Sequence, residues 1–476
     1  METSEYDVVV LGAGPVGQVA ADRCRAAGLS VAVVERELVG GECSYWGCVP
    51  SKAMLRPVLA LNDARRVDGA RSAVTGRVEA EGVFRRRDKY TTNWDDSGQA
   101  AWVGSIGADL VRGQGRLDGP RRVSVETPDD RVVVLTARQA VIMAPGSRAA
   151  LPDIPGIAEA RPWTNRRATD EHMIPGRLVV VGGGPVGVEM ATAWQALGSQ
   201  VTLVSQTSLL PRMEPFAGQM VERGLKEAGT EVRTGVAVTE LRRPDPDGPV
   251  TVSLEDGVEL VADEVLMAIG RVPLTGDLGL QTVGLTPGTW VDVDDTCTVR
   301  GVDGDWLYAI GDVNHRALLT HEGKYQSRIV GNVIAARATG TAVDTAAWSP
   351  YVASADRHAV PQVIFSDPEA GMAGLTASEA ERAGHRVAVV DVDMVKAVGT
   401  LLWADDYSGH ARMVVDLDSE TLLGVTFVGP GVADLLHSAT VAIAGQVPID
   451  RLWHAVPVFP TISEVWLRLL EAYRDR

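Results

Sequence analysis

The sequence predicts an α/β protein, and three observations support that prediction. A pattern of strand, glycine-rich turn, helix and second strand occurs twice, beginning near Tyr6 and again near Leu178. The strand segments are unbroken runs of β-branched residues, which is typical of parallel strands buried on both faces. The chain has 476 residues, which at about 150 residues per domain gives room for roughly three domains. We therefore expect two similar three-layer, sheet-and-helix domains and a further domain.

The composition excludes several classes of protein. Hydrophobic residues make up 45% of the chain and charged residues 22%, as in a globular protein rather than a disordered one. The 45 basic and 62 acidic residues give a net charge of −17, which disfavours binding to nucleic acid or to an anionic membrane. The first residues lack the pattern of a secretory signal, and no run of about 18 apolar residues could span a membrane. We therefore expect a cytoplasmic protein.

The first repeat is a candidate nucleotide-binding turn. An expected strand over Tyr6–Leu11 runs into a turn that contains Gly12, Gly14 and Gly17, followed by an Ala-rich helix and a second strand. Gly12 permits the tight turn, Gly14 lets the backbone approach a pyrophosphate, and Gly17 lets the helix pack against the strand. Phosphates would then lie at the helix N-terminus. Glu35 ends the second strand, where a carboxylate can bind a ribose hydroxyl.

The second repeat has the same spacing. Gly182, Gly184 and Gly187 stand 170 residues after the three glycines of the first turn, again between a β-branched strand and a helix. One such glycine pattern is weak evidence, because ordinary turns also contain glycine. Two copies at a constant offset indicate two related nucleotide-binding units.

The two repeats differ where the ribose would lie. Glu35 of the first repeat is replaced by Ser205, which is followed by polar residues 206–208 and, further on, by Arg212. Without the carboxylate a 2'-phosphate is not repelled, and a nearby arginine can bind it. The second unit is therefore predicted to prefer NADP(H) over NAD(H).

Two of the four cysteines form a candidate redox pair. Cys43 and Cys48 lie just after the first repeat, and an apolar run after Pro50 predicts a helix that starts near this proline. The dipole of that helix would favour a Cys48 thiolate. A structural disulfide and two unrelated buried thiols remain alternatives, whereas a zinc site would need further ligands that are not nearby.

This segment carries a family resemblance. Residues 41–52 read GECSYWGCVPSK; the first nucleotide motif precedes this segment and the second follows it. In this respect the chain resembles the flavin-dependent pyridine nucleotide-disulfide oxidoreductases, which include glutathione reductase, dihydrolipoamide dehydrogenase and mercuric reductase. The resemblance covers essentially the whole chain. Further matching landmarks are residues 144–146, 268–273, 308–312, 318–321 and 366–369.

The resemblance implies a domain organisation and a set of partners. It implies a discontinuous FAD domain over 1–158 and 271–345, a Rossmann-like NAD(P)H domain over 159–270, and an α+β dimerisation domain over 346–476. The family forms homodimers in which the C-terminal motif of one subunit completes the disulfide site of the other. The implied cofactors are FAD and NADP(H), and the implied partner is a small-molecule electron acceptor.

The resemblance also implies a role for individual residues. Hydride would pass from the nicotinamide to FAD and electrons then to the disulfide, with Cys48 against the flavin, Cys43 as the exposed thiol, and Lys52 and Glu189 as an ion pair beside the flavin. The residues implied to bind FAD are Gly12, Gly14, Gly17, Glu35, Lys52, Gly115, Gly146, Gly311, Asp312, Leu319, Thr320 and His321. Those implied to bind the nicotinamide cofactor are Gly182, Gly184, Gly187, Ser205, Arg212 and Gly270.

One position departs from the family pattern. Disulfide reductases of the family use a C-terminal histidine as the base for the exposed thiol, oriented by a glutamate five residues later. Here Phe459 stands in place of the histidine, while Glu464 is retained. A phenyl ring transfers no proton, and general acid–base catalysis is worth about 10²- to 10⁴-fold. We therefore expect poor turnover of ordinary disulfides, unless another base such as His454 substitutes.

The departure leaves several functions open. The preferred interpretation is an oxidoreductase that passes electrons to a quinone, a dye, dioxygen or a metal ion. A dihydrolipoamide dehydrogenase-like disulfide reductase with a different base is an alternative. An enzyme similar to 2-ketopropyl-coenzyme M oxidoreductase/carboxylase, which also has phenylalanine here, is another, although the retained Glu464 weakens that match. A degenerate flavoprotein that acts as an interaction subunit is the alternative outside enzymes.

Overall fold

The computed structural model describes residues 2–476, which form two compact units. The second glycine repeat and the C-terminal region fall in the same unit, and the predicted three-domain boundaries stay a prediction. The first unit comprises the residues up to Pro50, Asp88–Arg148 and Arg271–Arg357, and the second comprises Ser51–Arg87, Ala149–Gly270 and His358–Arg476.

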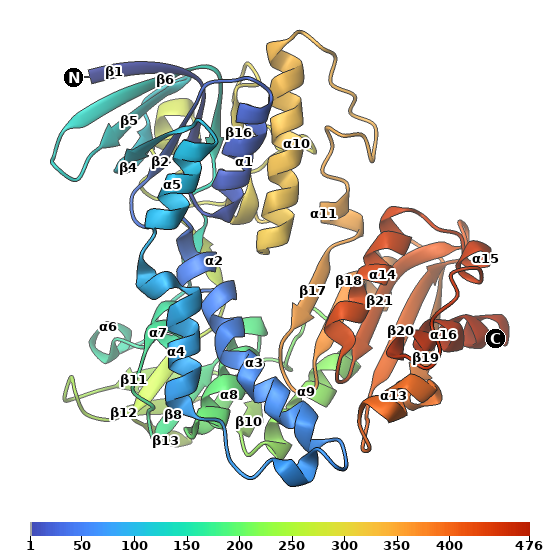
Figure 1. Ribbon diagram of the computed structural model, residues 1–476. Helices are drawn as coiled ribbons and strands as arrows, with labels where there is room; N and C mark the ends of the chain where they lie inside the picture. Colours follow the sequence, from blue (N-terminus) through green and yellow to red (C-terminus); the bar gives the residue numbers. More distant parts are fainter. Residues whose placement is uncertain (1) are drawn as a thin grey trace. The chain divides into compact units, whose positions relative to one another are not determined.

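The first unit is built on a seven-stranded sheet, in the order β3-β2-β1-β6-β5-β4 with β16 also beside β6. Its central strands are parallel, and β5 and β4 extend one edge in antiparallel fashion. Helices α1 and α10 lie side by side (Figure 1). The elements are β1 (Glu2–Leu11), α1 (Pro15–Ala26), β2 (Val31–Glu35), α2 (Gly41–Tyr45), α5 (Ser97–Ser105), β3 (Asp109–Arg112), β4 (Gln114–Leu117), β5 (Arg122–Glu126), β6 (Val132–Met143), β16 (Leu307–Ala309) and α10 (Thr320–Ala338).

Both faces of this sheet are buried, as its strand composition predicts. Val8 and Val10 of β1 pack into a core with α1 and α10, while Val9 and Leu11 pack into a second core with residues 278–302 on the opposite face. Successive side chains of a strand point to opposite faces, so a strand buried on both sides has no polar alternation. The three-layer prediction is confirmed for this unit.

The second nucleotide unit repeats this arrangement in a four-stranded parallel sheet, β10-β9-β8-β14. Leu178 of β8 pairs with Val201 of β9, and Val8 pairs with Val31 in the first unit, so the offset of 170 residues holds in the strand register. Helices cover one face and an antiparallel sheet of β11, β12 and β13 the other. The elements are α6 (Ile157–Ala160), α7 (Asn165–Asp170), β8 (Arg177–Val181), α8 (Pro185–Leu197), β9 (Gln200–Ser205), α9 (Pro215–Glu227), β10 (Glu231–Thr234), β11 (Val238–Arg242), β12 (Val250–Leu254), β13 (Glu259–Ala262) and β14 (Glu264–Met267).

The C-terminal region has an antiparallel sheet in the order β17-β18-β21-β20-β19, drawn in orange and red in Figure 1. Helix α14 packs against β18 and β21, and α16 packs against β19. The mixture of antiparallel strands and helices confirms the predicted α+β architecture of the C-terminal region. Its elements are β17 (Pro361–Ile364), β18 (Ala370–Gly374), α12 (Ala377–Arg382), β19 (Val387–Asp393), α13 (Val398–Trp403), β20 (His410–Asp416), β21 (Thr421–Val428), α14 (Val432–Ala444), α15 (Ile449–Leu452) and α16 (Val465–Arg474).

The remaining helices and strands lie where the chain passes from one unit to the other. Within α4, Arg87 is fully buried, donates to the carbonyl oxygen of Glu171 at 2.6 Å and lies over the ring of Phe84. Such a buried arginine is not evident from the sequence, because its partners lie about 85 residues away. These elements are α3 (Cys48–Arg65), α4 (Ala80–Tyr90), β7 (Ser147–Ala149), β15 (Arg271–Pro273) and α11 (Ala355–His358).

Candidate functional site

The first glycine turn connects β1 to α1 and has no room for side chains at two positions. Gly12 has φ +104°, and a β-carbon there would lie 2.2 Å from the carbonyl oxygen of Ala144. A β-carbon on Gly17 would lie 1.9 Å from the carbonyl oxygen of Gly12. At Gly14, by contrast, a β-carbon would meet nothing within 4 Å. Protein backbone therefore packs tightly against Gly12 and Gly17, while the space beside Gly14 is open. Gly14 precedes α1, so a pyrophosphate can approach the start of this helix.

Glu35 lies at the end of β2, beside this turn. Its Oε2 accepts a hydrogen bond from the backbone N–H of Ala13 at 2.7 Å, and its Oε1 accepts one from Glu37 at 2.8 Å. Burial raises the pKa of this carboxyl, and the backbone hydrogen bonds oppose the increase. An ionised carboxylate has about four lone-pair sites, so it can accept further hydrogen bonds from ribose hydroxyls. The open glycine and this carboxylate fit the pyrophosphate and ribose of FAD.

Gly115, which was predicted among the FAD residues, has a packing reason to be glycine. It is buried in β4, where a β-carbon would lie 2.8 Å from Leu11 Cδ2 and 2.9 Å from Val34 Cγ1. Side chains of β1 and β2 therefore fill the space beside it. Its role toward FAD stays a prediction.

Asp312 lies in a short 3₁₀ helix, Gly311–Asn314, directly after β16. The hydroxyl of Ser147 donates a hydrogen bond to Asp312 Oδ2. Arg271 donates to the same hydroxyl at 2.5 Å through Nε and to the Ser147 carbonyl at 2.6 Å through Nη2. Arg271 Nε also lies 3.7 Å from Asp312 Oδ2. Asp312 is thus held in place from two distant segments of the chain.

The sequence assigned no role to Ser147 or to Arg271, although Arg271 lies in the matching segment 268–273. A signal was present, because these residues directly follow Gly146 and Gly270, which were both predicted to bind cofactors. Gly146 has φ +76° and Gly270 has φ +134°, values that favour glycine. The residue after each glycine is therefore fixed in direction, and in the structure Ser147 and Arg271 point to each other.

The cysteine pair lies at the start of α3. Cys43 is in α2, and Cys48 is the first residue of α3, so this helix begins two residues before the predicted start at Pro50. Both cysteines are free thiols in the structure. The Sγ of Cys48 lies 3.4 Å from the hydroxyl of Thr320, the first residue of α10. The structure thus brings together three residues predicted for one site, and His321 follows Thr320 in α10.

The environment of the two thiols differs. A hydrogen bond with Cys48 and burial raise the pKa of Cys43 well above its usual range, and the positive charge of Lys324 opposes this. Cys43 is partly buried, while Cys48 is exposed. The sequence predicts the opposite order of exposure, so the division of roles between the two thiols stays a prediction.

The second glycine turn, between β8 and α8, repeats the geometry of the first. Gly182 has φ +120°, and a β-carbon there would lie 2.3 Å from the carbonyl oxygen of Ala268. A β-carbon on Gly187 would lie 1.8 Å from the carbonyl oxygen of Gly182, and one on Gly184 would meet nothing within 4 Å. The phosphate-facing opening is therefore present in both turns.

The ribose end of the second turn carries no carboxylate. Ser205 ends β9 with 4% of its surface exposed, and its Oγ would lie 2.6 Å from a β-carbon at Gly183. The loop after β9 folds back over the turn, since the N–H of Leu210 donates to the carbonyl oxygen of Gly183 at 2.9 Å. Arg212 is exposed further along that loop. Ser205 thus fills space beneath the turn and adds no charge there.

Lys52 and Glu189 form the predicted ion pair. Lys52 Nζ donates to Glu189 Oε2 at 2.6 Å, and the Glu189 side chain is 6% exposed. The other oxygen, Oε1, accepts a hydrogen bond from the backbone N–H of Phe365 at 3.1 Å. Lys52 Nζ also lies 5.1 Å from the centre of the Phe365 ring. Both carboxylate oxygens of the buried glutamate are therefore satisfied.

Phe459 and Glu464 lie in different environments, one exposed and one buried. The Phe459 side chain lies in the loop before α16 and is 68% exposed, and Val456 and Val458 in the same loop are also exposed. Glu464 is buried; its Oε2 accepts a hydrogen bond from the N–H of Val398 at 3.1 Å and its Oε1 one from the guanidinium of Arg468. Glu464 is held by α13 and α16.

The described residues contain neither a metal-binding cluster nor a membrane-spanning helix. Among residues 2–476, no group of three or more His, Cys, Asp and Glu side chains could hold a metal ion. Over the same residues, no helix is long and apolar enough to cross a membrane.

Comparison with known proteins identifies the family. Residues 6–340 match the family described as pyridine nucleotide-disulphide oxidoreductase, and residues 360–469 match its dimerisation domain. The chain belongs to the pyridine nucleotide-disulphide oxidoreductase family. This family consists of enzymes that bind FAD and a pyridine nucleotide, and the dimerisation domain supports formation of a homodimer.

Relatives of this pyridine nucleotide-disulphide oxidoreductase span its whole length. The dihydrolipoyl dehydrogenases of Haloferax volcanii and Halobacterium salinarum are each 30% identical to it, over 98% of this chain and 95% of each relative. Among solved structures, the Cu(II) complex of the HOCl-induced flavoprotein disulfide reductase RclA from Escherichia coli has a TM-score of 0.81 at 21% identity. That match covers 98% of this chain and 99% of RclA and shows a shared fold.

Proposed function

We propose that the protein is an FAD-dependent oxidoreductase that takes electrons from NADPH and passes them, through Cys43 and Cys48, to an acceptor that requires no proton from a histidine. Such acceptors are a quinone, a dye, dioxygen or a metal ion. The observation that carries this proposal is Phe459, which stands where a disulfide reductase of the family has its base.

The first unit supplies the proposed FAD site. Gly12, Gly14 and Gly17 shape the pyrophosphate turn, Glu35 accepts hydrogen bonds from the ribose, and Asp312 does the same for the ribityl chain. When bound, FAD would relay two electrons from the pyridine nucleotide to the disulfide. The second unit supplies the proposed NADPH site, where the lack of a carboxylate at Ser205 favours a ribose that carries a 2'-phosphate.

The two cysteines store the electrons. Reduction by two electrons breaks the Cys43–Cys48 bond and, with two protons, gives the two thiols; transfer of both electrons to the acceptor re-forms the bond and releases the protons. Thr320, 3.4 Å from Cys48, offers a hydroxyl that can hydrogen-bond the thiolate. We assign Lys52 and Glu189 to a position beside the flavin, where their 2.6 Å ion pair would hold the Lys52 ammonium group in place.

The C-terminal segment argues against ordinary disulfide turnover. A disulfide acceptor needs a proton on its leaving thiolate, and Phe459 has none to give. Glu464, which would orient a histidine, instead accepts hydrogen bonds from Val398 and Arg468. His454 is exposed, five residues upstream of Phe459.

The known relatives support two candidate acceptors. The structurally similar RclA forms a Cu(II) complex, which favours a metal ion as acceptor. The relatives named dihydrolipoyl dehydrogenase favour lipoamide, with another base in place of the missing histidine. The second candidate predicts fast lipoamide reduction by the wild-type protein, and the first predicts slow lipoamide reduction with fast reduction of quinones, dyes or Cu(II).

An acceptor panel with Phe459 variants separates these candidates. We expect Phe459→His to raise reduction of lipoamide and glutathione disulfide by about tenfold or more, because a proton donor is restored. Quinone and dye reduction should stay within about twofold, since neither needs that donor. Val458→His, which adds a histidine one residue away, is the matched control and should raise neither. Wild-type rates of disulfide reduction typical of the family would overturn the proposal.

Anaerobic titration tests the redox pair and the nucleotide. Stepwise addition of NADPH should produce a long-wavelength thiolate-to-flavin absorbance band that is absent in Cys48→Ser. NADPH should reach the end point at a lower concentration than NADH. Absence of the band in the wild type would instead favour a flavoprotein whose cysteines are not redox-active.

A further inference from the structure

Two buried carboxyl groups lie together in the first unit. Glu322 is in the first turn of α10 and Asp356 is in α11, with 4% and 6% of their surfaces exposed. The two carboxyl groups face each other, so that protonation of one would allow a hydrogen bond between them. Glu322 Oε2 and Asp356 Oδ1 are both buried and receive no hydrogen bond from an N–H or O–H group of residues 2–476. A single proton between the carboxyl groups would satisfy both oxygens, which are otherwise costly to bury.

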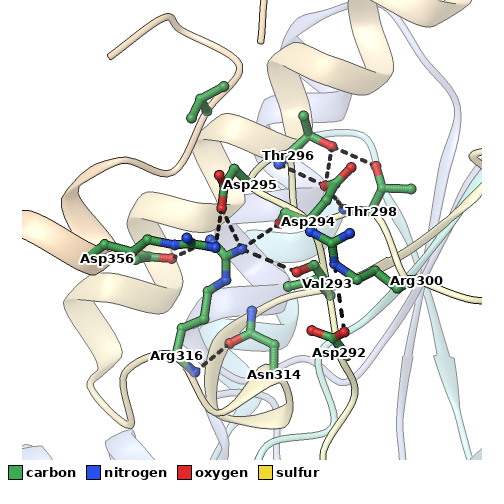
Figure 2. A network of polar contacts seen from close by, with 12 residues as sticks. Asp292, Val293, Asp294, Asp295, Thr296, Thr298, Arg300, Asn314, Arg316 and Asp356 are labelled. Carbon is green, nitrogen blue, oxygen red and sulfur yellow. Dashed lines mark hydrogen bonds and ion pairs between the residues drawn. The ribbon is translucent and has the colours of Figure 1, made fainter. Parts of the chain in front are cut away.

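One cation, Arg316, lies beside the pair and forms an ion pair with Asp356. Arg316 Nη1 lies 3.7 Å from Asp356 Oδ2, while its Nη2 donates to the carbonyl oxygen of Asp294 at 2.7 Å and to Asp295 Oδ1 at 2.9 Å (Figure 2). Arg316 Nη1 itself has no hydrogen-bond partner among the described residues. Arg316 therefore shares its single positive charge between Asp356 and Asp295, and no full positive charge is left to balance two ionised carboxylates in the pair. The other titratable or charged groups that face the pair are Arg328, His321, Tyr325 and Cys297.

One side chain connects the pair to the segment proposed to hold FAD. Gln326 donates through Nε2 to Asp356 Oδ2 at 2.8 Å. Its Oε1 accepts hydrogen bonds from the backbone N–H of Gly311 at 2.7 Å and from the side chain of Asn314 at 2.9 Å. Gly311 directly precedes Asp312. The orientation of the Gln326 amide therefore links the carboxyl pair to the backbone that carries Asp312.

We propose that Glu322 and Asp356 share one proton and, through Gln326, position the Gly311–Asp312 segment for FAD, so that loss of this proton at alkaline pH weakens FAD binding. The inference rests on the proposed role of Asp312 toward FAD. Both carboxyls are positioning residues, since neither is proposed to touch the cofactor.

The charge environment supports this assignment. Burial, together with Asp356, raises the pKa of Glu322 from 4.5 to about 8, and burial also raises the pKa of Asp356. The folded protein therefore retains a proton that the unfolded chain loses above its ordinary carboxyl pKa. Because the unfolded state then binds fewer protons, the free energy of unfolding falls as pH rises from about 4.5 to about 8.

The first experiment measures FAD affinity of the full-length protein against pH. Between about pH 7 and about pH 9, we expect the FAD dissociation constant of the wild type to rise several-fold, and at most about tenfold for one coupled proton. Glu322→Gln should remove this dependence, because a glutamine N–H can donate to Asp356 and does not titrate. Glu381→Gln, at an exposed glutamate of α12, is the matched control and should keep the wild-type profile. An unchanged profile in Glu322→Gln would overturn the proposal.

The second experiment does not involve FAD. Urea unfolding of the apoprotein should give a free energy that falls from about pH 5 to about pH 8 in the wild type and falls less in Glu322→Gln and Asp356→Asn. Equal slopes in all three proteins would show that no proton is shared. If the unfolding slopes differ while FAD affinity does not, the shared proton stands, and its proposed coupling through Gln326 to the Gly311–Asp312 segment is overturned.

Discussion

The two glycine turns have almost the same backbone and different side chains at the ribose end. In each turn one glycine has positive φ and faces a carbonyl oxygen at the end of a neighbouring strand. A β-carbon would lie 2.2 Å from this oxygen at Gly12 and 2.3 Å from it at Gly182. A β-carbon on the glycine in the following helix, Gly17 or Gly187, would clash with the carbonyl oxygen of that first glycine. Both copies therefore require glycine at the same two positions, because backbone carbonyl oxygens leave no space for a β-carbon there.

The side chains beside the turns are where the copies differ. In the first turn residue 13 is alanine, and its N–H donates to the carboxylate of Glu35. In the second turn the equivalent residue is Gly183, and Ser205 occupies the space that a β-carbon would need. The comparison teaches that the two turns share one backbone geometry and differ at the residue that ends the second strand, Glu35 in one and Ser205 in the other, where we propose that the nucleotide is selected.

The largest effect should come from the glycines that face a carbonyl oxygen. Gly12→Ala and Gly182→Ala should each lower the free energy of unfolding by about 3 kcal/mol or more, because strain at positive φ adds to the clash. Gly12→Ala should also lose FAD, whereas Gly182→Ala should keep it. Urea unfolding and flavin absorbance measure both effects.

Gly28→Ala and Gly198→Ala are matched controls for this pair. Both glycines have positive φ but open space around a β-carbon, so each should cost only about 1 kcal/mol. Equal losses at Gly12 and Gly28 would show that the carbonyl contact is unimportant.

The next largest effect should follow removal of the Glu35 carboxylate. Glu35→Ala should raise the FAD dissociation constant by about 10- to 100-fold, because charge-assisted hydrogen bonds to the ribose are lost. Titration of the apoprotein with FAD measures this. Ser205→Ala should leave FAD affinity unchanged, and a similar loss in both variants would contradict the assignment of FAD to the first unit.

Placing the first unit's carboxylate in the second unit tests the nucleotide preference. Ser205→Glu should weaken NADPH binding by about tenfold, since a carboxylate repels the 2'-phosphate, and should leave NADH binding less affected. The ratio of kcat/KM for the two nucleotides with a dye acceptor measures the change. Equal weakening of both nucleotides would indicate that the larger side chain simply disrupts the turn against Gly183.

The smallest effect is a pH dependence confined to the first unit. Burial raises the pKa of Glu35, so its carboxylate is lost at a higher pH than that of an exposed glutamate when the solution is acidified. FAD affinity should therefore fall as pH decreases through this raised pKa, and Glu35→Gln should abolish the dependence. NADPH binding should lack this contribution, because Ser205 does not titrate; a parallel acid transition in both would contradict the comparison.

The sequence was sufficient for features that repeat or that depend on short spacings. The offset between the two turns predicted two related units, whose strand registers show the same offset in the structure, and the segment over 41–52 predicted the family. The Lys52–Glu189 pair followed from that resemblance, and the structure places the two side chains 2.6 Å apart.

Features built from distant segments were not predictable in this way. Ser147 and Arg271 are 124 positions apart, and their contact depends on how two chain crossings meet at Asp312. Arg87 follows two arginines on a polar helix, so its complete burial depends on acceptors far away in the chain. Glu464 matches the family pattern in sequence, yet its hydrogen bonds go to Arg468 and to α13.

The exposed loop with Val456, Val458 and Phe459 has a consequence for handling the protein. Three large apolar side chains in water destabilise a protomer that stands alone and are expected where another protein surface covers them. If pairing of two protomers through the dimerisation domain covers this loop, mass action links stability to protein concentration. The melting temperature should then rise as the protein is concentrated, and activity should decay on extreme dilution.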